Sequence, residues 1–83
     1  MSIQAINARN QFRGTIKAII TGPVVSEVEV ETPSGIIVTS VITTRSLNEL
    51  GLAVGIEVIA LVKATEVALA KPQRATALFT NPV

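Results

Sequence analysis

Short apolar runs separated by turn-forming residues constrain the fold of this chain more than any other feature of its sequence. In residues 24–31, valines alternate with Glu27 and Glu29, which is the pattern of a half-buried strand with one charged, solvated face. In residues 36–43, apolar side chains fall on both faces, and such a strand is usually covered on both sides. Both runs therefore favour β structure.

Three further runs complete the predicted set of strands. They span residues 12–20, 56–62 and 66–70, the last being a short fifth strand. The sequence Pro33-Ser34-Gly35 predicts a hairpin turn between the second and third strands, and Gly22-Pro23 separates the first from the second. Each strand is thus bounded by residues that favour turns.

One short helix is expected between the third and fourth strands. Ser46 and Glu49 have the spacing of a capping box, and Gly51 can end the helix in the left-handed conformation. Five short strands with one small helix favour an all-β fold, a compact Greek-key barrel of the OB type. The alternative is an open meander that a neighbouring subunit completes.

Size and composition limit the functions that the chain can have. A domain of 83 residues buries only about 60–65% of the surface of its unfolded chain, so we expect stability to depend on oligomerisation. The chain has no Cys and no His, which argues against disulfides, thiolate chemistry and most cation sites. Without His, Cys or Asp, and with no paired Glu or Lys arrangement, we expect no catalysis.

Charge and hydropathy limit the kinds of partner that the chain can bind. The net charge of +1 and the presence of only two aromatic residues argue against binding of single-stranded nucleic acid or of an anionic membrane. No apolar stretch reaches the roughly 20 residues of a membrane span, and the N-terminus lacks the pattern of a signal peptide. We expect a cytoplasmic protein with no membrane partner.

Cations and hydrogen-bond donors stand at the edges of three strand-like runs. They lie in residues 7–14, which open the first run, in 41–46, which end the third, and in 63–67, which follow the fourth. A small, fully deprotonated tetrahedral oxyanion has only acceptor oxygens, so its site needs donors and excludes carboxylates. The sequence therefore predicts a site for a small oxyanion.

Several spaced motifs in residues 5–69 carry a resemblance to a known family. They are Asn7-Ala8-Arg9-Asn10-Gln11, Gly14-Thr15-Ile16-Lys17, Ile42-Thr43-Thr44-Arg45-Ser46, Glu49-Leu50-Gly51-Leu52, Gly55 and Lys63-Ala64-Thr65-Glu66-Val67. The chain resembles the molbindins, which are molybdate-binding proteins built from one Mop-type domain. The resemblance implies an OB-like fold, a homohexamer arranged as a trimer of dimers, and molybdate or tungstate bound at subunit interfaces. It further implies a role in intracellular molybdenum storage, without catalysis.

The resemblance also implies which residues bind the oxyanion. Transferred by position, they are Asn7, Arg9, Thr43, Lys63, Ala64 and Thr65. Asn7 stands where the family has serine, and Ala64 offers only its backbone N–H. For Thr43 and Thr65 an ordinary strand role is the alternative, because threonine is common in strands. Ser46 is expected to cap the helix.

Two matters stay open at this stage. The chief alternative function is a structural or interaction module of the same OB-like fold that binds no ligand. The domain is predicted to span residues 1–70, followed by a C-terminal extension of residues 71–83 that the family lacks. The apolar Ala77-Leu78-Phe79 favours packing of this extension against a neighbouring subunit or the end of the barrel, and an unpacked chain end is the alternative.

Overall fold

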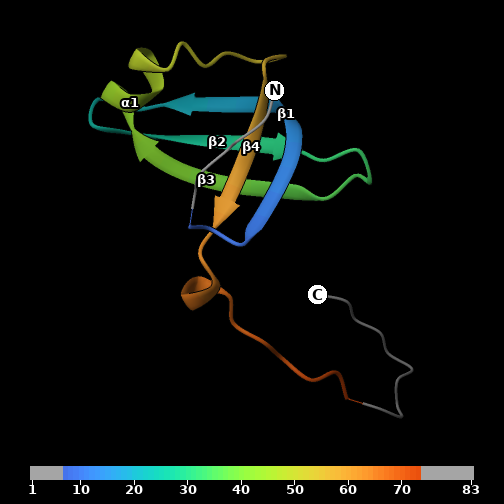
Figure 1. The fold of residues 1–83 in the computed structure, drawn as a ribbon. Helices are drawn as coiled ribbons and strands as arrows, with labels where there is room; N and C mark the ends of the chain where they lie inside the picture. The colour runs from blue at the N-terminus through green and yellow to red at the C-terminus, as the bar shows by residue number, and fades with distance from the viewer. Residues whose placement is uncertain (1–6, 74–83) are drawn as a thin grey trace.

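A computed structural model describes residues 7–73 of the protein. Residues 1–6 and 74–83, and with them the predicted packing of Ala77-Leu78-Phe79, lie outside the described residues. The elements in order are β1 (Asn10–Thr21), β2 (Val25–Glu31), β3 (Ile37–Thr43), α1 (Thr44–Glu49), β4 (Glu57–Val62) and the 3-10 helix η1 (Ala64–Glu66) (Figure 1). The first four predicted strands and the single short helix are confirmed.

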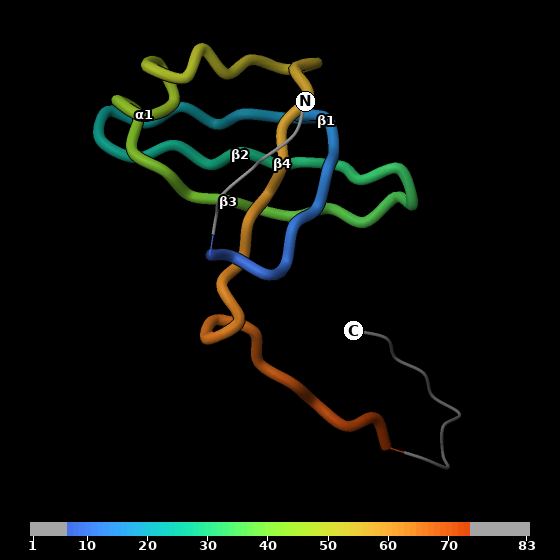
Figure 2. The backbone as a smooth tube through the Cα atoms, viewed as in Figure 1, coloured from blue at the N-terminus to red at the C-terminus, as the bar shows by residue number. Residues whose placement is uncertain are grey.

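The strands form one antiparallel sheet in the order β3-β2-β1-β4. Strand β1 curves along its length, as Figure 2 shows, and pairs with β4 through its first half and with β2 through its second. Thr15 belongs to both ladders, opposite Glu57 on β4 and Glu31 on β2. This switch of partners along one long strand bends the sheet toward a barrel.

A β-bulge in β1 keeps its apolar side chains on the concave side. Ile16 pairs with Val30 but Ala18 pairs with Glu29, so Lys17 is an extra residue in β1. The bulge lets Ile16 and Ile19 both face the core, although an odd spacing of three would place them on opposite faces of a regular strand.

The core is small and lies between the sheet and α1. Its buried apolar residues are Ile16, Val28, Val30 and Leu47, with Ile19, Val38, Ile42, Leu52 and Val58 packed against them. Val28 and Val30 thus supply the buried face that the alternation in β2 predicts. The result is the small OB-like all-β fold expected from the sequence, with four strands in the described residues. No helix among these residues is long and apolar enough to cross a membrane.

The prediction that Ser46 caps the helix is wrong. The helix begins at Thr44 and its N-cap is Thr43, whose hydroxyl accepts a hydrogen bond from the Ser46 N–H at 3.0 Å. Thr43 has the extended backbone of a cap residue (φ −68°, ψ 147°), which the end of β3 provides directly. The C-terminal prediction is confirmed, because Gly51 adopts the left-handed conformation with φ 65° just after the C-cap Leu50.

The predicted fifth strand over residues 66–70 is also not found in the described part of the chain. Glu66 ends η1, and residues 67–73 pair with no strand. In Figure 1 this orange-to-red stretch runs away from the sheet, and Leu69 is 94% exposed. The physical reason is that a segment becomes a strand only where it can pair with the edge of a sheet. Residues 67–73 lead away from the edges of their own sheet, so they have nothing to pair with there.

The barrel is therefore open between β3 and β4. A largely apolar cavity of about 310 Å³ lies there, and core residues of both strands line it, among them Val38, Ile42 and Val58. The outer face of β3 is also uncovered in the single chain, with Val41 64% exposed. The cover expected on both faces of this strand is not provided by the described residues of one chain.

Candidate functional site

The register of β1 and β4 brings two predicted cationic ligands to the same end of the ladder. Its outermost pair is Asn10 with Val62, so Arg9 precedes and Lys63 follows the last paired residues. Both residues are exposed. In the part of the chain that the structure describes, neither makes an ion pair or a side-chain hydrogen bond. Two cations thus stand at one end of the sheet with no carboxylate bound to them.

Three neighbours of Arg9 fix the backbone around it. Ala8 is buried at 5% exposure, and its carbonyl accepts a hydrogen bond from Gln11 Nε2 at 3.0 Å. Asn10 Nδ2 donates to the Val62 carbonyl at 3.1 Å and so joins the ends of β1 and β4. Anchoring on both sides limits the positions that the Arg9 guanidinium can reach.

The sequence reasoning missed the role of Asn10 and Gln11. Asn10 is in phase with Phe12, Gly14 and Ile16 along β1. Asn10 is a polar residue at the end of an otherwise apolar face, and this position is the signal for a side chain that forms a hydrogen bond to the neighbouring strand.

The residues after β4 add backbone donors beside Lys63. Lys63 is the N-cap of η1, and the first hydrogen bond of this turn runs from the Glu66 N–H to the Lys63 carbonyl at 2.8 Å. The N–H groups of Ala64 and Thr65 precede that bond and are not used by the turn. Because Thr65 lies in η1 and is exposed, the alternative of an ordinary strand role is wrong for it. Glu66 is the one carboxylate in the same turn.

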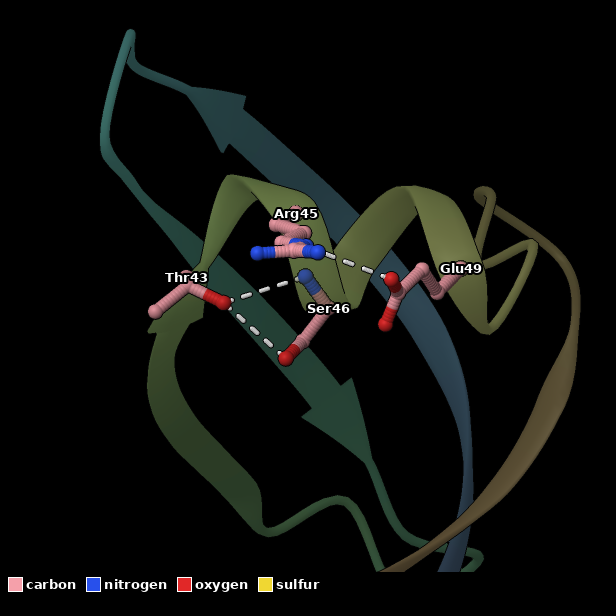
Figure 3. A network of polar contacts seen from close by, with 4 residues as sticks. All are labelled: Thr43, Arg45, Ser46 and Glu49. Carbon is pink, nitrogen blue, oxygen red and sulfur yellow. Dashed lines mark hydrogen bonds and ion pairs between the residues drawn. The ribbon is translucent and has the colours of Figure 1, made fainter.

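Thr43 has a different local role, shown in Figure 3. Its Oγ1 accepts from the Ser46 N–H and donates to Ser46 Oγ at 2.9 Å. Arg45 and Glu49 form an exposed i,i+4 ion pair at 3.3 Å on the same helix. Thr43 is exposed, so its hydroxyl is accessible from solvent even while it caps α1.

One copy of the chain does not bring all the predicted ligands together. Strands β3 and β4 run in opposite directions in the sheet, so Thr43 at the end of β3 and Lys63 after β4 lie at opposite ends of it. Asn7 is exposed before β1, and no hydrogen bond joins it to the other predicted ligands in residues 7–73. The predicted set therefore divides into an Arg9–Lys63 group and a separate Thr43.

A closed ring of hydrogen bonds, which the sequence reasoning also missed, ties the Thr43 end together. The Thr44 hydroxyl donates to the Gly22 carbonyl at 2.7 Å, so the Ser26 hydroxyl, 2.7 Å from it, must donate to Thr44. Ser26 in turn accepts from the Gly22 N–H at 3.4 Å. Ser26 is 2% exposed and Gly22 and Thr44 are half-buried, and the ring holds the start of α1 on the β1–β2 turn.

A second surface depression lies elsewhere and suits an anion poorly. It measures about 390 Å³ and is lined by Arg13, Glu31 and Glu57 beside the turn at Pro33. Two carboxylates against one guanidinium make it an unfavourable place for an oxyanion. Among the described residues there is no cluster of three or more His, Cys, Asp or Glu side chains that could hold a metal cation.

Comparison with known proteins gives a consistent family. Residues 6–69 match the TOBE domain. The molybdenum-pterin-binding protein 3 of Clostridium pasteurianum is 41% identical over 63 residues, which cover 76% of this chain and 93% of that protein. The molybdenum-pterin-binding protein MopA of Rhodobacter capsulatus is 48% identical over 62 residues, but this chain spans only 23% of its length.

A solved structure agrees with this match. The cytoplasmic molybdate-binding protein ModG, crystallised with molybdate bound, has a TM-score of 0.80 and 39% identity to this chain. The match covers 83% of this chain and 49% of ModG. The OB-like fold and the family resemblance seen in the sequence are thereby confirmed.

Proposed function

This chain belongs to the TOBE domain family, and on that premise we propose that it binds molybdate, with tungstate as the alternative oxyanion, between copies of itself. The observation that carries the proposal is that Arg9 and Lys63 flank the outermost pair of the β1–β4 ladder, Asn10 with Val62. Two cations without a carboxylate partner, on a backbone anchored by Asn10 and Gln11, supply the charge that a dianion requires. The proteins whose names mention molybdenum or molybdate are relatives of this chain across most of its length.

The donor set suits a fully deprotonated tetrahedral anion. Arg9 offers a planar fork, Lys63 a point charge, and Ala64 and Thr65 backbone N–H groups at the start of η1. Asn7 adds an amide donor from the segment before β1. Hydrogen phosphate carries a proton that would need an acceptor in this donor-rich site, so we expect it to bind less well than molybdate.

Thr43 enters this site from a second copy. Because it lies at the opposite end of the sheet from Lys63, an interface between two copies is the simplest way to join the two groups. The Thr43 hydroxyl can keep accepting from the Ser46 N–H while its own proton turns from Ser46 Oγ to the anion. Helix capping and ligand binding are therefore compatible at this one side chain.

Assembly is the second part of the proposal. We infer a homohexamer built as a trimer of dimers, in line with the resemblance stated above. The open side of the barrel between β3 and β4 is apolar, and Val67 and Leu69 are exposed on a segment that leaves its own sheet. Burial of this segment in the open side of a neighbour would remove both apolar surfaces from water.

The expected role is storage of molybdenum as its oxyanion in the cytoplasm, without catalysis. Many identical sites in one small assembly favour a buffer that takes up and releases the anion. The competing possibility is a module of the same fold that binds no ligand. The main argument for it is that Asn7 stands where the family has serine.

Native mass spectrometry with and without molybdate tests this function directly. We expect a hexamer that gains discrete molybdate increments, and we expect Arg9→Ala and Lys63→Ala to lose most of them because each removes a cation from the anchored pair. Lys17→Ala is the matched control, since Lys17 is an exposed cation on β1 that is not among the predicted ligands.

Two outcomes would contradict the proposal. A hexamer that takes up no molybdate at any concentration would leave the ligand-free module as the function. Equal losses in the Lys17→Ala and Lys63→Ala variants would reduce the site to nonspecific attraction by net charge.

A further inference from the structure

The outer side of the sheet carries an acidic face that the proposed function does not use. Glu27 and Glu29 project there from the central strand β2, flanked in the ladders by Ile20 and Val41 beside Glu27 and by Thr39 beside Glu29. We call these five residues the acidic face. Neither glutamate has an ion pair in the described part of the chain.

Isolated like charges at this spacing are unfavourable. Residues two apart on one face of a strand lie about 7 Å from each other, and the half-buried state of both glutamates weakens solvent screening between them. Next to them, Ile20 and Val41 are 66% and 64% exposed. A face with paired carboxylates and adjoining apolar side chains is complementary to a segment that carries cations followed by apolar residues.

The C-terminal extension, residues 71–83, has that composition. It contains Lys71 and Arg74 and no Asp or Glu, followed by Leu78 and Phe79. Residues 1–70 hold five Lys or Arg and six Glu, so the body of the chain is net negative and the extension carries a charge of +2. The family match ends at residue 69, so the extension lies outside the shared domain.

We propose that the extension of one copy docks on the acidic face of a neighbouring copy. A neighbouring copy is favoured because residues 67–73 run away from their own sheet and are exposed (Figure 1). The ten residues after Gln73 can span up to about 33 Å when extended, more than the length of β2. Lys71 and Arg74 then neutralise the two glutamates, and Leu78 and Phe79 cover Ile20 and Val41.

This inference rests on the assembly part of the proposed function and not on molybdate binding. The chain has no cysteine, so single cysteines can report which segments meet. We would co-express a Thr39→Cys chain with a Leu78→Cys chain, oxidise the mixed assembly and follow the mixed disulfide by peptide mass spectrometry. Thr39 is exposed and pairs with Glu29. The matched control replaces Thr39→Cys by Glu49→Cys, an exposed position on α1 away from the acidic face.

We expect the mixed disulfide with Thr39→Cys to form about tenfold faster than with Glu49→Cys, because docking raises the local concentration of the two thiols. Adding Glu27→Lys and Glu29→Lys to the first chain should abolish that difference. Adding Lys71→Glu and Arg74→Glu to the second chain should then restore it, which loss of folding alone would not allow.

Two results would overturn the inference. They are equal rates for the two cysteine positions and no effect of charge reversal. Native mass of the same samples separates the failures: equal rates in an intact hexamer reject the docking alone, whereas equal rates in a monomer reject the proposed assembly with it.

Discussion

Thr43 is the residue at which folding and binding meet. Its hydroxyl closes the first turn of α1 as a cap, and we propose from its position in the family motif that it also binds the oxyanion. An N-cap acts as an acceptor, whereas an anion needs a donor. A hydroxyl can accept one hydrogen bond and donate another at the same time, whereas a carboxylate can only accept.

Substitutions at Thr43 should therefore separate stability from binding. Thr43→Asp keeps a good N-cap, so we expect its melting temperature to stay near that of the native chain, while its charge repels molybdate and abolishes binding. Thr43→Val removes the cap and should cost about 1 kcal/mol of unfolding free energy in addition to binding. Thr43→Ser should retain both properties. Thermal denaturation and calorimetry with molybdate give the two quantities.

The contrary result at this position is simple to recognise. Full binding by Thr43→Asp would show that the residue only caps the helix and that the anion is held elsewhere.

Gly14 is the second residue with a defined steric role. A Cβ at this position would lie 2.6 Å from the Glu31 carbonyl oxygen and 2.7 Å from Val30 Cγ1, at the place where β1 changes partner from β4 to β2. We expect Gly14→Ala to lower the free energy of unfolding by about 1–3 kcal/mol, since backbone must shift to admit the methyl group. Urea denaturation measures this. A variant as stable as the native chain would mean that the two strands can separate there without cost.

At the scale of elements, α1 is held by its connection to the β1–β2 turn more than by its own length. A helix of six residues has little intrinsic stability. Leu47 packs in the core, and the ring of Gly22, Ser26 and Thr44 fixes the first turn. The polar ring thus defines where the end of β3 becomes helix.

Removing the Thr44 hydroxyl should release this helix. Thr44→Val leaves the buried Ser26 hydroxyl and the Gly22 carbonyl without their partner, so we expect a loss of about 1–3 kcal/mol. Thr44→Ser should restore most of it. Thr39→Val is the control, an exposed strand position where the change should stay within about 0.5 kcal/mol. Chemical denaturation gives the free energy of unfolding of the three variants. A Thr44→Val chain as stable as Thr39→Val would contradict the expected loss.

The strands and the hairpin could be predicted from sequence because their signals are local. Alternation of Val28 and Val30 with glutamates specifies a face, and Gly35 with φ 92° provides the turn that Pro33-Ser34-Gly35 indicates. The sequence misplaces the start of the helix because the local pattern is compatible with either Thr43 or Ser46 as the N-cap. Only the ring at Thr44 decides between them, and its partners lie about twenty residues earlier.

The sequence proposes which residues form the candidate site but not how they are arranged. Motif spacing points to Arg9 and Lys63, yet their proximity depends on the register of β1 and β4, whose outermost pair, Asn10 with Val62, joins residues 52 positions apart. Alternation of side chains is compatible with several registers that differ by two residues. The predicted fifth strand is wrong for a related reason, since the apolar run at residues 67–70 leads away from its own sheet and pairs with none of its described strands.

For the whole molecule, ligand and assembly should be coupled. An anion bound between copies stabilises the assembled state by mass action, by about 2.7 kcal/mol at a concentration one hundred times its dissociation constant. We expect molybdate to raise the melting temperature of the native chain and to have little effect on Arg9→Ala. Sulfate at equal ionic strength is the control for general salt effects, and an equal rise with sulfate would reject a selective site.

The open side of the barrel gives the last prediction. The cavity between β3 and β4 is lined by core residues, and within residues 7–73 neither bordering strand has a partner on that side, so this part of a single copy leaves apolar surface and unpaired edges in water. Val67 and Leu69, 48% and 94% exposed, lie on a segment suited to cover such a gap in a second copy. Val67→Lys with Leu69→Lys should therefore dissociate the oligomer in analytical ultracentrifugation.

The control for this dissociation is Ile36→Lys, which places the same charge on an exposed apolar residue of the β2–β3 hairpin. Circular dichroism should show that dissociated copies keep their strands, because Ile16, Val28, Val30 and Leu47 are already buried within one chain. An oligomer of unchanged mass in the double variant would mean that this segment does not hold the copies together. Loss of all strand signal would instead mean that the barrel cannot fold unless a neighbour closes it.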